Sequence, residues 1–226
     1  MLTCRSYLML CFSLFILFTS SFAIASDRDP NEAFTVLATA GADYLNDSGD
    51  APGVLSAFSL NDNLEYYTVI DIRSESSYLN GHIPGAFHSS LSTLVDDLAF
   101  RIPTDKPYVV VGYSGQVACQ AKIAMELLGY EDSKCLLFGM SSWNSSLDVW
   151  TQNCADNLAF PETENQNPNL IVHPYPELTE DPETVVQDRV QYMLESGYKG
   201  ISYAAIEANL DQYFIINHFS ESDYMG

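Results

Sequence analysis

The sequence predicts an α/β layer fold built around a mostly parallel β-sheet. Short apolar runs at 67–72, 108–111 and 134–138 are rich in β-branched and large apolar residues and have strand length. None of the three alternates polar with apolar residues, which is typical of strands that are covered on both faces. Segments with helical spacing separate them, and this alternation favours right-handed strand–helix–strand crossovers.

The N-terminus is predicted to be a leader outside the fold. Residues 1–25 combine Arg5, a nearly continuous apolar run at 8–18, and the small-residue pattern at 23–25. Together these are typical of a secretory signal peptide. An uncleaved membrane anchor is the alternative, but the apolar run is short for a span. We therefore expect an exported protein, periplasmic or extracellular, that keeps no stable membrane anchor after cleavage before Ser26.

The elements before the central strand follow in order. Helical spacing predicts helices over 32–47, 74–80 and 90–100, with Ser74 as the N-cap of the second. A short helix or turn is expected after Gly53. The Gly-His-Ile-Pro-Gly-Ala string at 81–86 is a turn that leads into a short strand near Phe87.

The loop at 112–117 is the most informative stretch. It joins the apolar strand at 108–111 to a helix whose period begins at Val117 and ends before Gly129. Such a loop aims several backbone N–H groups at one point, and the helix dipole favours negative charge there. The residues alone therefore predict an anion-binding loop. A further strand at 134–138 and a helix entered through Gly139 complete the pattern.

Composition limits the partners. The 226 residues carry 30 acidic and 9 basic side chains, for a formal net charge of −21. This charge repels phosphate backbones, so we expect no nucleic-acid partner. Solubility explains the charge more simply than recognition of cations. The four histidines show no metal-ligand spacing, and we expect no metal and no cofactor.

Three cysteines follow the leader: Cys119, Cys135 and Cys154. An odd number leaves at least one free thiol. Cys135 opens a strand and is expected in the core. The first candidate for a disulfide is Cys135–Cys154. Placed on a helical wheel, Cys119 points away from the apolar face, which predicts a spectator or partly packed thiol.

The C-terminal part predicts an incomplete repeat. Residues 67–79 recur at 213–225 with a constant offset, and the upstream helix is matched as well. The chain is thus divided into a leader, a domain at 26–158, a Pro/Asn-rich acidic linker at 159–183, and a partial second copy at 184–226.

The order of motifs resembles the rhodanese family of sulfurtransferases. The match runs from Asp-Ile-Arg at 71–73 through the 81–86 string and the strand–loop–helix unit to Gly139 and Trp143. The resemblance implies a domain with about five strands flanked by helices, with a second such domain beginning near 192. Residues expected to be structural are Asp71, Arg73, His82, Pro84, Gly85 and Trp143.

The resemblance also implies where chemistry should occur. In rhodaneses a cysteine at the first loop position accepts a sulfane sulfur and passes it to a thiophilic acceptor, but Gly112 occupies that position here. No Lys or Arg lies in 107–121, and Cys119 is a weak substitute nucleophile. The remaining candidate binding residues are Tyr113, Ser114, Gly115, Gln116 and Val117.

Two functions remain open from the sequence. The first is a catalytically inactive binding or structural module with an unknown partner. The second is one half of a tandem thiosulfate or persulfide sulfurtransferase whose catalytic cysteine lies in another domain. A phosphatase-like relative is weaker, because that chemistry also requires the loop cysteine.

Overall fold

The computed structural model describes residues 31–47, 53–153, 174–213 and 215–216. Within these residues the strands form one five-stranded sheet in the order β1-β5-β4-β2-β3, and every neighbouring pair is parallel. The strands are β1 (Val54–Leu55), β2 (Thr68–Asp71), β3 (Phe87–His88), β4 (Tyr108–Val111) and β5 (Lys134–Leu136). The predicted α/β fold with a parallel sheet is confirmed.

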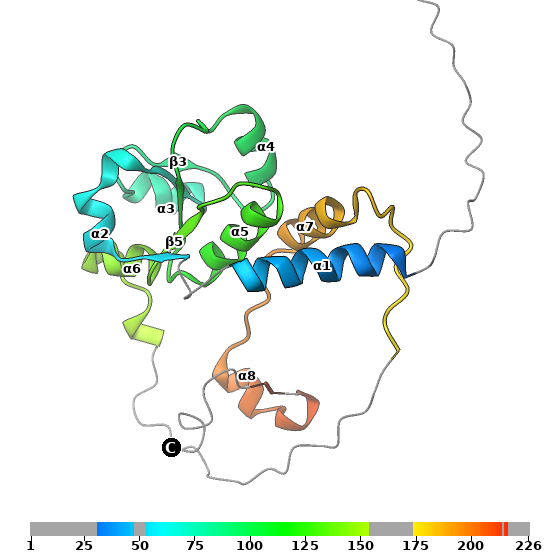
Figure 1. Cartoon of the computed structure of the whole chain (residues 1–226). Coiled ribbons are helices and arrows are strands. Elements are labelled where there is room, and N and C mark those ends of the chain that lie inside the picture. Colours follow the sequence, from blue (N-terminus) through cyan, green and yellow to red (C-terminus); the bar gives the residue numbers. More distant parts are fainter. Residues whose placement is uncertain (1–30, 48–52, 154–173, 214, 217–226) are drawn as a thin grey trace, which may run out of the picture.

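Helices surround the sheet (Figure 1). They are α1 (Glu32–Asp47), α2 (Ala57–Asp62), α3 (Glu75–Asn80), α4 (Leu94–Phe100), α5 (Gln116–Leu127), α6 (Gly139–Trp143), α7 (Val185–Glu195) and α8 (Tyr203–Glu207). Short 3-10 turns follow at Leu64–Tyr66, Ser145–Leu147, Thr151–Asn153 and Leu210–Gln212.

Local chemistry explains where several elements begin and end. Ser74 caps α3 by accepting a hydrogen bond from the Ser77 backbone N–H, as predicted. The helix predicted over 90–100 begins only at Leu94, because Ser90 accepts a hydrogen bond from the Thr93 N–H and closes a turn. The last predicted strand ends at Leu136 rather than at 138, since the left-handed φ of 56° at Phe138 turns the chain into α6.

The sheet has a core on each face. Side chains alternate along β4, so Val110 faces one layer while Val109 and Val111 face the other. On the first face Val110 packs among α4 and α5 residues, and on the second the valines pack among α2 and α6 residues. Burial on both faces explains why the strands are continuously apolar.

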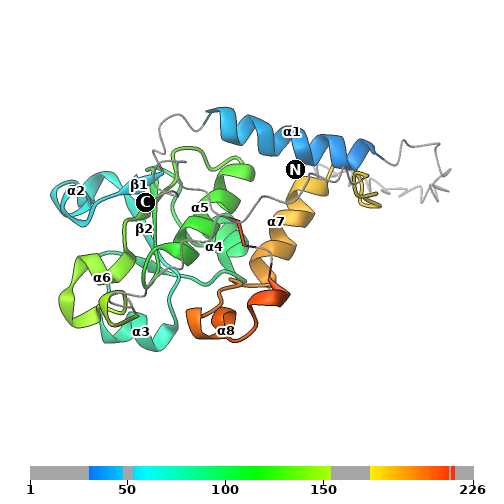
Figure 2. The same ribbon diagram turned by 90° about the horizontal axis from the view of Figure 1, so that it is seen from below.

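A second helical layer covers the outer side of α5. Helices α1 and α7 lie side by side there, and both views agree (Figures 1 and 2). Ala124 of α5 forms a buried cluster with Val190 and Leu194 of α7. Lys122 of α5 donates a hydrogen bond to the Tyr44 hydroxyl of α1 at 3.1 Å. Helix α5 is therefore packed on two sides, toward the sheet and toward α1 and α7.

Residues 202–213 have the same local structure as residues 56–67. Ser56 caps α2 and Ser202 caps α8, each by accepting a hydrogen bond from the backbone N–H three residues later. The Asn63 amide donates to the Ser59 carbonyl at 2.9 Å, and the Asn209 amide donates to the Ala205 carbonyl at 3.1 Å. A 3-10 turn then follows in both segments.

The two segments diverge after this turn. Thr68–Asp71 forms strand β2, whereas Tyr213, Ile215 and Ile216 are not assigned to a strand. Ile215 is 61% exposed and Ile216 is 65% exposed, while Ile70 in the first segment is fully buried. The expectation of a second repeat therefore stays a prediction, although it is supported locally by the matched caps and turns.

Four predictions fall wholly or largely outside the described residues: the leader at 1–25, most of the linker at 159–183, the pairing partner Cys154, and most of the repeated segment at 213–225. Among the helices that the structure describes, none has the length and apolar character needed to cross a membrane.

Candidate functional site

The loop between β4 and α5 lies at the carboxyl end of the central strand. Strand β4 is buried along its length, and Gly115, with a φ of 96°, turns the chain into α5 as its N-cap. No side chain caps the helix, and the Cys119 N–H bonds back to the Gly115 carbonyl at 2.9 Å. The N–H groups of residues 116–118 precede that bond and have no acceptor within the helix. The loop therefore presents backbone donors at a helix N-terminus.

Residues of helix α6 hold the loop by hydrogen bonds to its backbone carbonyl groups. The Met140 N–H donates to the Gly112 carbonyl at 2.9 Å, and Ser141 donates to the Tyr113 carbonyl through its N–H at 3.2 Å and its hydroxyl at 3.0 Å. Gly139 has a φ of 54°, and a Cβ there would overlap the Gly112 carbonyl oxygen. This close approach requires glycine at 139.

Gly112 has room for a side chain. A Cβ built on it would lie 3.5 Å from the Ala118 backbone nitrogen, 3.7 Å from the Ala118 Cβ and 3.9 Å from the Val117 Cβ, all ordinary contacts. Its φ is not left-handed. The side chain would start beside the free N–H groups of α5, so this position can aim an atom at the helix N-terminus.

Tyr113 ties the loop to the start of α3. Its hydroxyl lies 3.0 Å from the Ser74 Oγ and 2.9 Å from the Ser77 Oγ, and it accepts a hydrogen bond from the Ser74 N–H at 3.3 Å. Burial acts to raise the pKa of Tyr113, but these hydrogen bonds and the nearby Arg73 charge outweigh it and lower the pKa. The Arg73 guanidinium carbon lies 5.8 Å from the Tyr113 ring centre.

Asp71 and Arg73 form a buried ion pair at the end of β2. The Arg73 Nη2 donates to Asp71 Oδ2 at 2.6 Å, and its Nε donates to both carboxylate oxygens. Nη2 also donates to the Gly81 carbonyl at 2.6 Å, which connects β2 to the 81–86 turn. The Arg73 guanidinium that lies over the Tyr113 ring is therefore paired with a buried carboxylate.

The other predicted structural residues lie around this turn and α6. The His82 ring stacks on Tyr78 with centres 3.9 Å apart, and its Nδ1 lies 2.8 Å from the Tyr78 carbonyl oxygen. Pro84 is exposed, and Gly85 takes a φ of 79° within the turn. Trp143 is half-buried and packs against the core between the sheet and α6.

The loop side chains predicted as binding residues are not convergent. Among the described residues, the Ser114 hydroxyl hydrogen-bonds only the Gln116 side chain, at 3.4 Å, and Val117 packs against the core beneath α5. The groups that converge at the loop are therefore backbone N–H groups. Tyr113 is the polar side chain that lies beside them, held by hydrogen bonds through its hydroxyl. Among the described residues, no group of three or more His, Cys, Asp or Glu side chains could hold a metal ion.

The prediction for the Cys119 orientation is wrong. Cys119 packs against the core beneath α5, and its Sγ lies 2.9 Å from the Sγ of Cys135. A single apolar face was assumed for α5, but the helix is packed on two sides, so its buried arc is wider than the wheel suggested. Cys135 is 2% exposed, as expected for a core residue, but the described thiol beside it is Cys119.

Comparison with known proteins identifies the fold. The rhodanese-like domain family matches residues 56–146. The chain is 33% identical over 78 residues to the thiosulfate sulfurtransferase GlpE of Shewanella oneidensis, which covers 34% of this chain and 76% of that protein. The chain belongs to the rhodanese-like family. The chain is also 36% identical over 77 residues to the thiosulfate sulfurtransferase GlpE of Pseudomonas paraeruginosa. That alignment covers 34% of this chain and 69% of that protein.

Solved structures show weaker likeness to this rhodanese-like chain. The rhodanese-related protein from Thermoplasma volcanium has 24% identity and a TM-score of 0.36, and covers 41% of this chain and 91% of its own. The Alr3790 protein from Anabaena has 28% identity and a TM-score of 0.37, and covers 41% of this chain and 77% of its own.

Sequence reasoning missed two contacts of this rhodanese-like domain. The spacing of Ser74 and Ser77 indicated only a helix cap, and nothing placed the Tyr113 hydroxyl between them. The contact between Cys119 and Cys135 was also missed. The sequence did contain one indication of this contact: a helix that follows a central strand packs over the neighbouring strands of the same sheet.

Proposed function

We propose that this rhodanese-like domain does not transfer sulfane sulfur at its loop and acts as a binding or structural module. The observation that carries the proposal is Gly112. It occupies the loop position beside the α5 N-terminus where the family mechanism needs a cysteine, and glycine offers no nucleophile. The backbone donors remain, so the loop keeps the geometry of an anion-binding turn without the covalent step.

The charges around the loop support the same conclusion. The loop and its flanks at 107–121 contain no Lys or Arg, and the Arg73 guanidinium near Tyr113 is held by Asp71. The whole chain carries a net charge of −21. An anionic sulfur donor such as thiosulfate would therefore approach a negatively charged protein at a loop whose own residues supply no cation.

A thiosulfate:cyanide sulfurtransferase assay tests this proposal directly. We expect no thiocyanate above the uncatalysed rate from the native chain. The matched variants are Gly112→Cys, which supplies the missing thiol, and Gly112→Ala, which adds only a Cβ. Turnover by the native chain that disappears in Cys119→Ser would contradict the proposal, since it would show that Cys119 replaces the loop nucleophile.

A second candidate function is a tandem sulfurtransferase. The observation in its favour is the repeated pair of cap and amide hydrogen bonds, at Ser56 and Asn63 and again at Ser202 and Asn209. If the natural reading frame continues, the corresponding second loop would begin about 146 residues after Gly112. A cysteine there would favour the tandem enzyme, and any other residue would favour the inactive module.

Export is part of the proposal and rests on the leader pattern at 1–25. The test is N-terminal sequencing of protein recovered from outside the cytoplasm of an expressing bacterium. A mature chain beginning at Ser26 is expected, and a full-length chain confined to the cytoplasm would contradict export.

A further inference from the structure

Two thiols outside the loop face one another between α5 and β5. The Sγ atoms of Cys119 and Cys135 are 2.9 Å apart, closer than two sulfur atoms in ordinary van der Waals contact. Both cysteines are free thiols in the structure. At this separation the two side chains point toward one another across the contact between α5 and β5, as the two halves of a disulfide must.

We propose that Cys119 and Cys135 form a dithiol site that exchanges with low-molecular-weight disulfides, with Cys119 as the attacking thiol and Cys135 as the resolving thiol. The site is separate from the loop nucleophile position, so it does not depend on whether the loop transfers sulfur. Its substrate class is a small disulfide such as glutathione disulfide.

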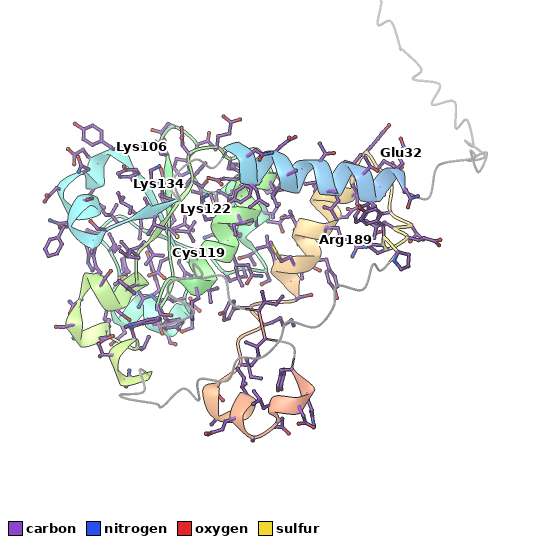
Figure 3. All side chains as sticks on the ribbon, turned by 60° about the horizontal axis from the view of Figure 1, so that its bottom comes forward. Glu32, Lys106, Cys119, Lys122, Lys134 and Arg189 are labelled. Atoms are coloured by element: carbon purple, nitrogen blue, oxygen red, sulfur yellow. The ribbon has the colours of Figure 1, made fainter. Side chains whose placement is uncertain are left out.

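Exposure assigns the two roles. Cys119 lies near the start of α5 (Figure 3) and is half-buried. Cys135 is 2% exposed, between β1 and β4 in the sheet, so an external disulfide cannot reach it first. A small disulfide therefore meets Cys119, and Cys135 is within reach of the mixed disulfide that results.

Electrostatics supports the same order. The hydrogen bond from the Cys135 thiol lowers the pKa of Cys119 to about 7, burial opposes this shift, and the Lys122 charge adds to it. The same contact, together with burial, raises the pKa of Cys135. Lys122 is itself bonded to Glu126 at 2.5 Å and to the Tyr44 hydroxyl. The thiolate, which is the nucleophile, thus forms on Cys119.

The exchange balances in two steps. The Cys119 thiolate attacks one sulfur of the small disulfide, a Cys119–S–S–R bond forms, and the other half leaves as a thiolate that takes a proton from water. Cys135 then loses its proton to solvent and attacks the Cys119 sulfur, which releases the second small thiol. Overall the protein dithiol loses two electrons and two protons, and one small disulfide becomes two thiols.

The experiment equilibrates the full reduced chain with glutathione disulfide near pH 7.5, traps free thiols by alkylation, and maps the products by mass spectrometry after chymotrypsin. This protease cuts after aromatic residues such as Phe138 and Trp150, which separates Cys135 from Cys154. We expect a cross-linked peptide pair that contains Cys119 and Cys135. The control variant Cys154→Ser should retain it.

The single variants test the roles. Cys135→Ser should accumulate a stable glutathione adduct on Cys119, and Cys119→Ser should leave Cys135 as an unmodified thiol. Circular dichroism of each variant checks that the fold is retained. Native protein in which both thiols remain alkylatable in excess glutathione disulfide would overturn the proposal, as would a Cys119 cross-link to Cys154. The native chain supplies the test even if a variant fails to fold.

Discussion

Gly112→Cys probes the loop geometry most sharply. The new Cβ would meet its nearest neighbours at 3.5 to 3.9 Å, which are ordinary contacts, and the backbone is not left-handed there. Replacing glycine also reduces the freedom of the unfolded chain. The free energy of unfolding should therefore change by less than about 1 kcal/mol.

The introduced thiol should be unusually acidic. It would begin beside the Ala118 nitrogen, at an α5 N-terminus that no side chain caps. Cysteines at helix N-termini titrate at about 3.5 to 7.5, against about 8.5 for an ordinary thiol. A pKa of about 7 raises the thiolate fraction at neutral pH from about 3% to about half, so alkylation at pH 7 should be roughly ten-fold or more faster.

The assay is iodoacetamide alkylation of the introduced thiol as a function of pH, read by peptide mass spectrometry, followed by incubation with thiosulfate to look for the gain of one sulfur atom. Urea unfolding provides the stability. Gly139→Ala is the matched control, because its Cβ would overlap the Gly112 carbonyl oxygen at a φ of 54° and should cost about 1–3 kcal/mol or more. If the pKa of the thiol at 112 is equal to or above that of an ordinary thiol, the N–H groups of α5 do not converge on this position.

Three other predictions concern contacts around the loop and α5. Tyr113→Phe removes the hydroxyl held by two serines and should lower the unfolding free energy by about 0.5–1.5 kcal/mol. The 63%-exposed Tyr66, changed to Phe as a control, should shift urea unfolding by less than about 0.5 kcal/mol. Arg73→Met leaves a buried carboxylate unpaired and should cost about 3–5 kcal/mol in the same measurement, and an unchanged midpoint would contradict the ion-pair account. Alkylation of native Cys119 should rise with pH through about 7, because the thiolate forms there, and Cys135→Ala should move this inflection upward by removing the hydrogen-bond donor. An inflection unchanged by that substitution would show that the thiols do not interact.

Much of the fold could be predicted because its signals are local. The apolar runs at 108–111 and 134–138 have strand length and are separated by segments with helical spacing, which predicts buried strands. Helix α1 was predicted with the bounds that the structure has. Boundaries failed where a few polar contacts decide the outcome. Because Ser90 closes a turn, α4 begins at Leu94 rather than at Ser90. Because Phe138 has a left-handed φ, β5 ends at Leu136. Neither signal is visible in hydrophobic periodicity.

The candidate site was predictable in position but not in its contacts. The loop at 112–117 follows from a strand that enters a helix, and the missing nucleophile is visible in the sequence as Gly112. The Tyr113 hydroxyl network joins segments about 40 residues apart. The Cys119–Cys135 contact depends on how far α5 is rotated over the sheet. Ala124 of α5 also packs against α7 on the other side of the helix, and no local pattern encodes that contact.

We propose that the loop presents helix N–H donors around a position with no nucleophile. Thiocyanate release from thiosulfate and cyanide, measured for the native chain beside Gly112→Cys and Gly112→Ala, tests it most directly. We expect no turnover by the native chain or by Gly112→Ala, and turnover that appears only in Gly112→Cys. Equal turnover by the native chain and Gly112→Ala, clearly above the uncatalysed rate, would contradict it.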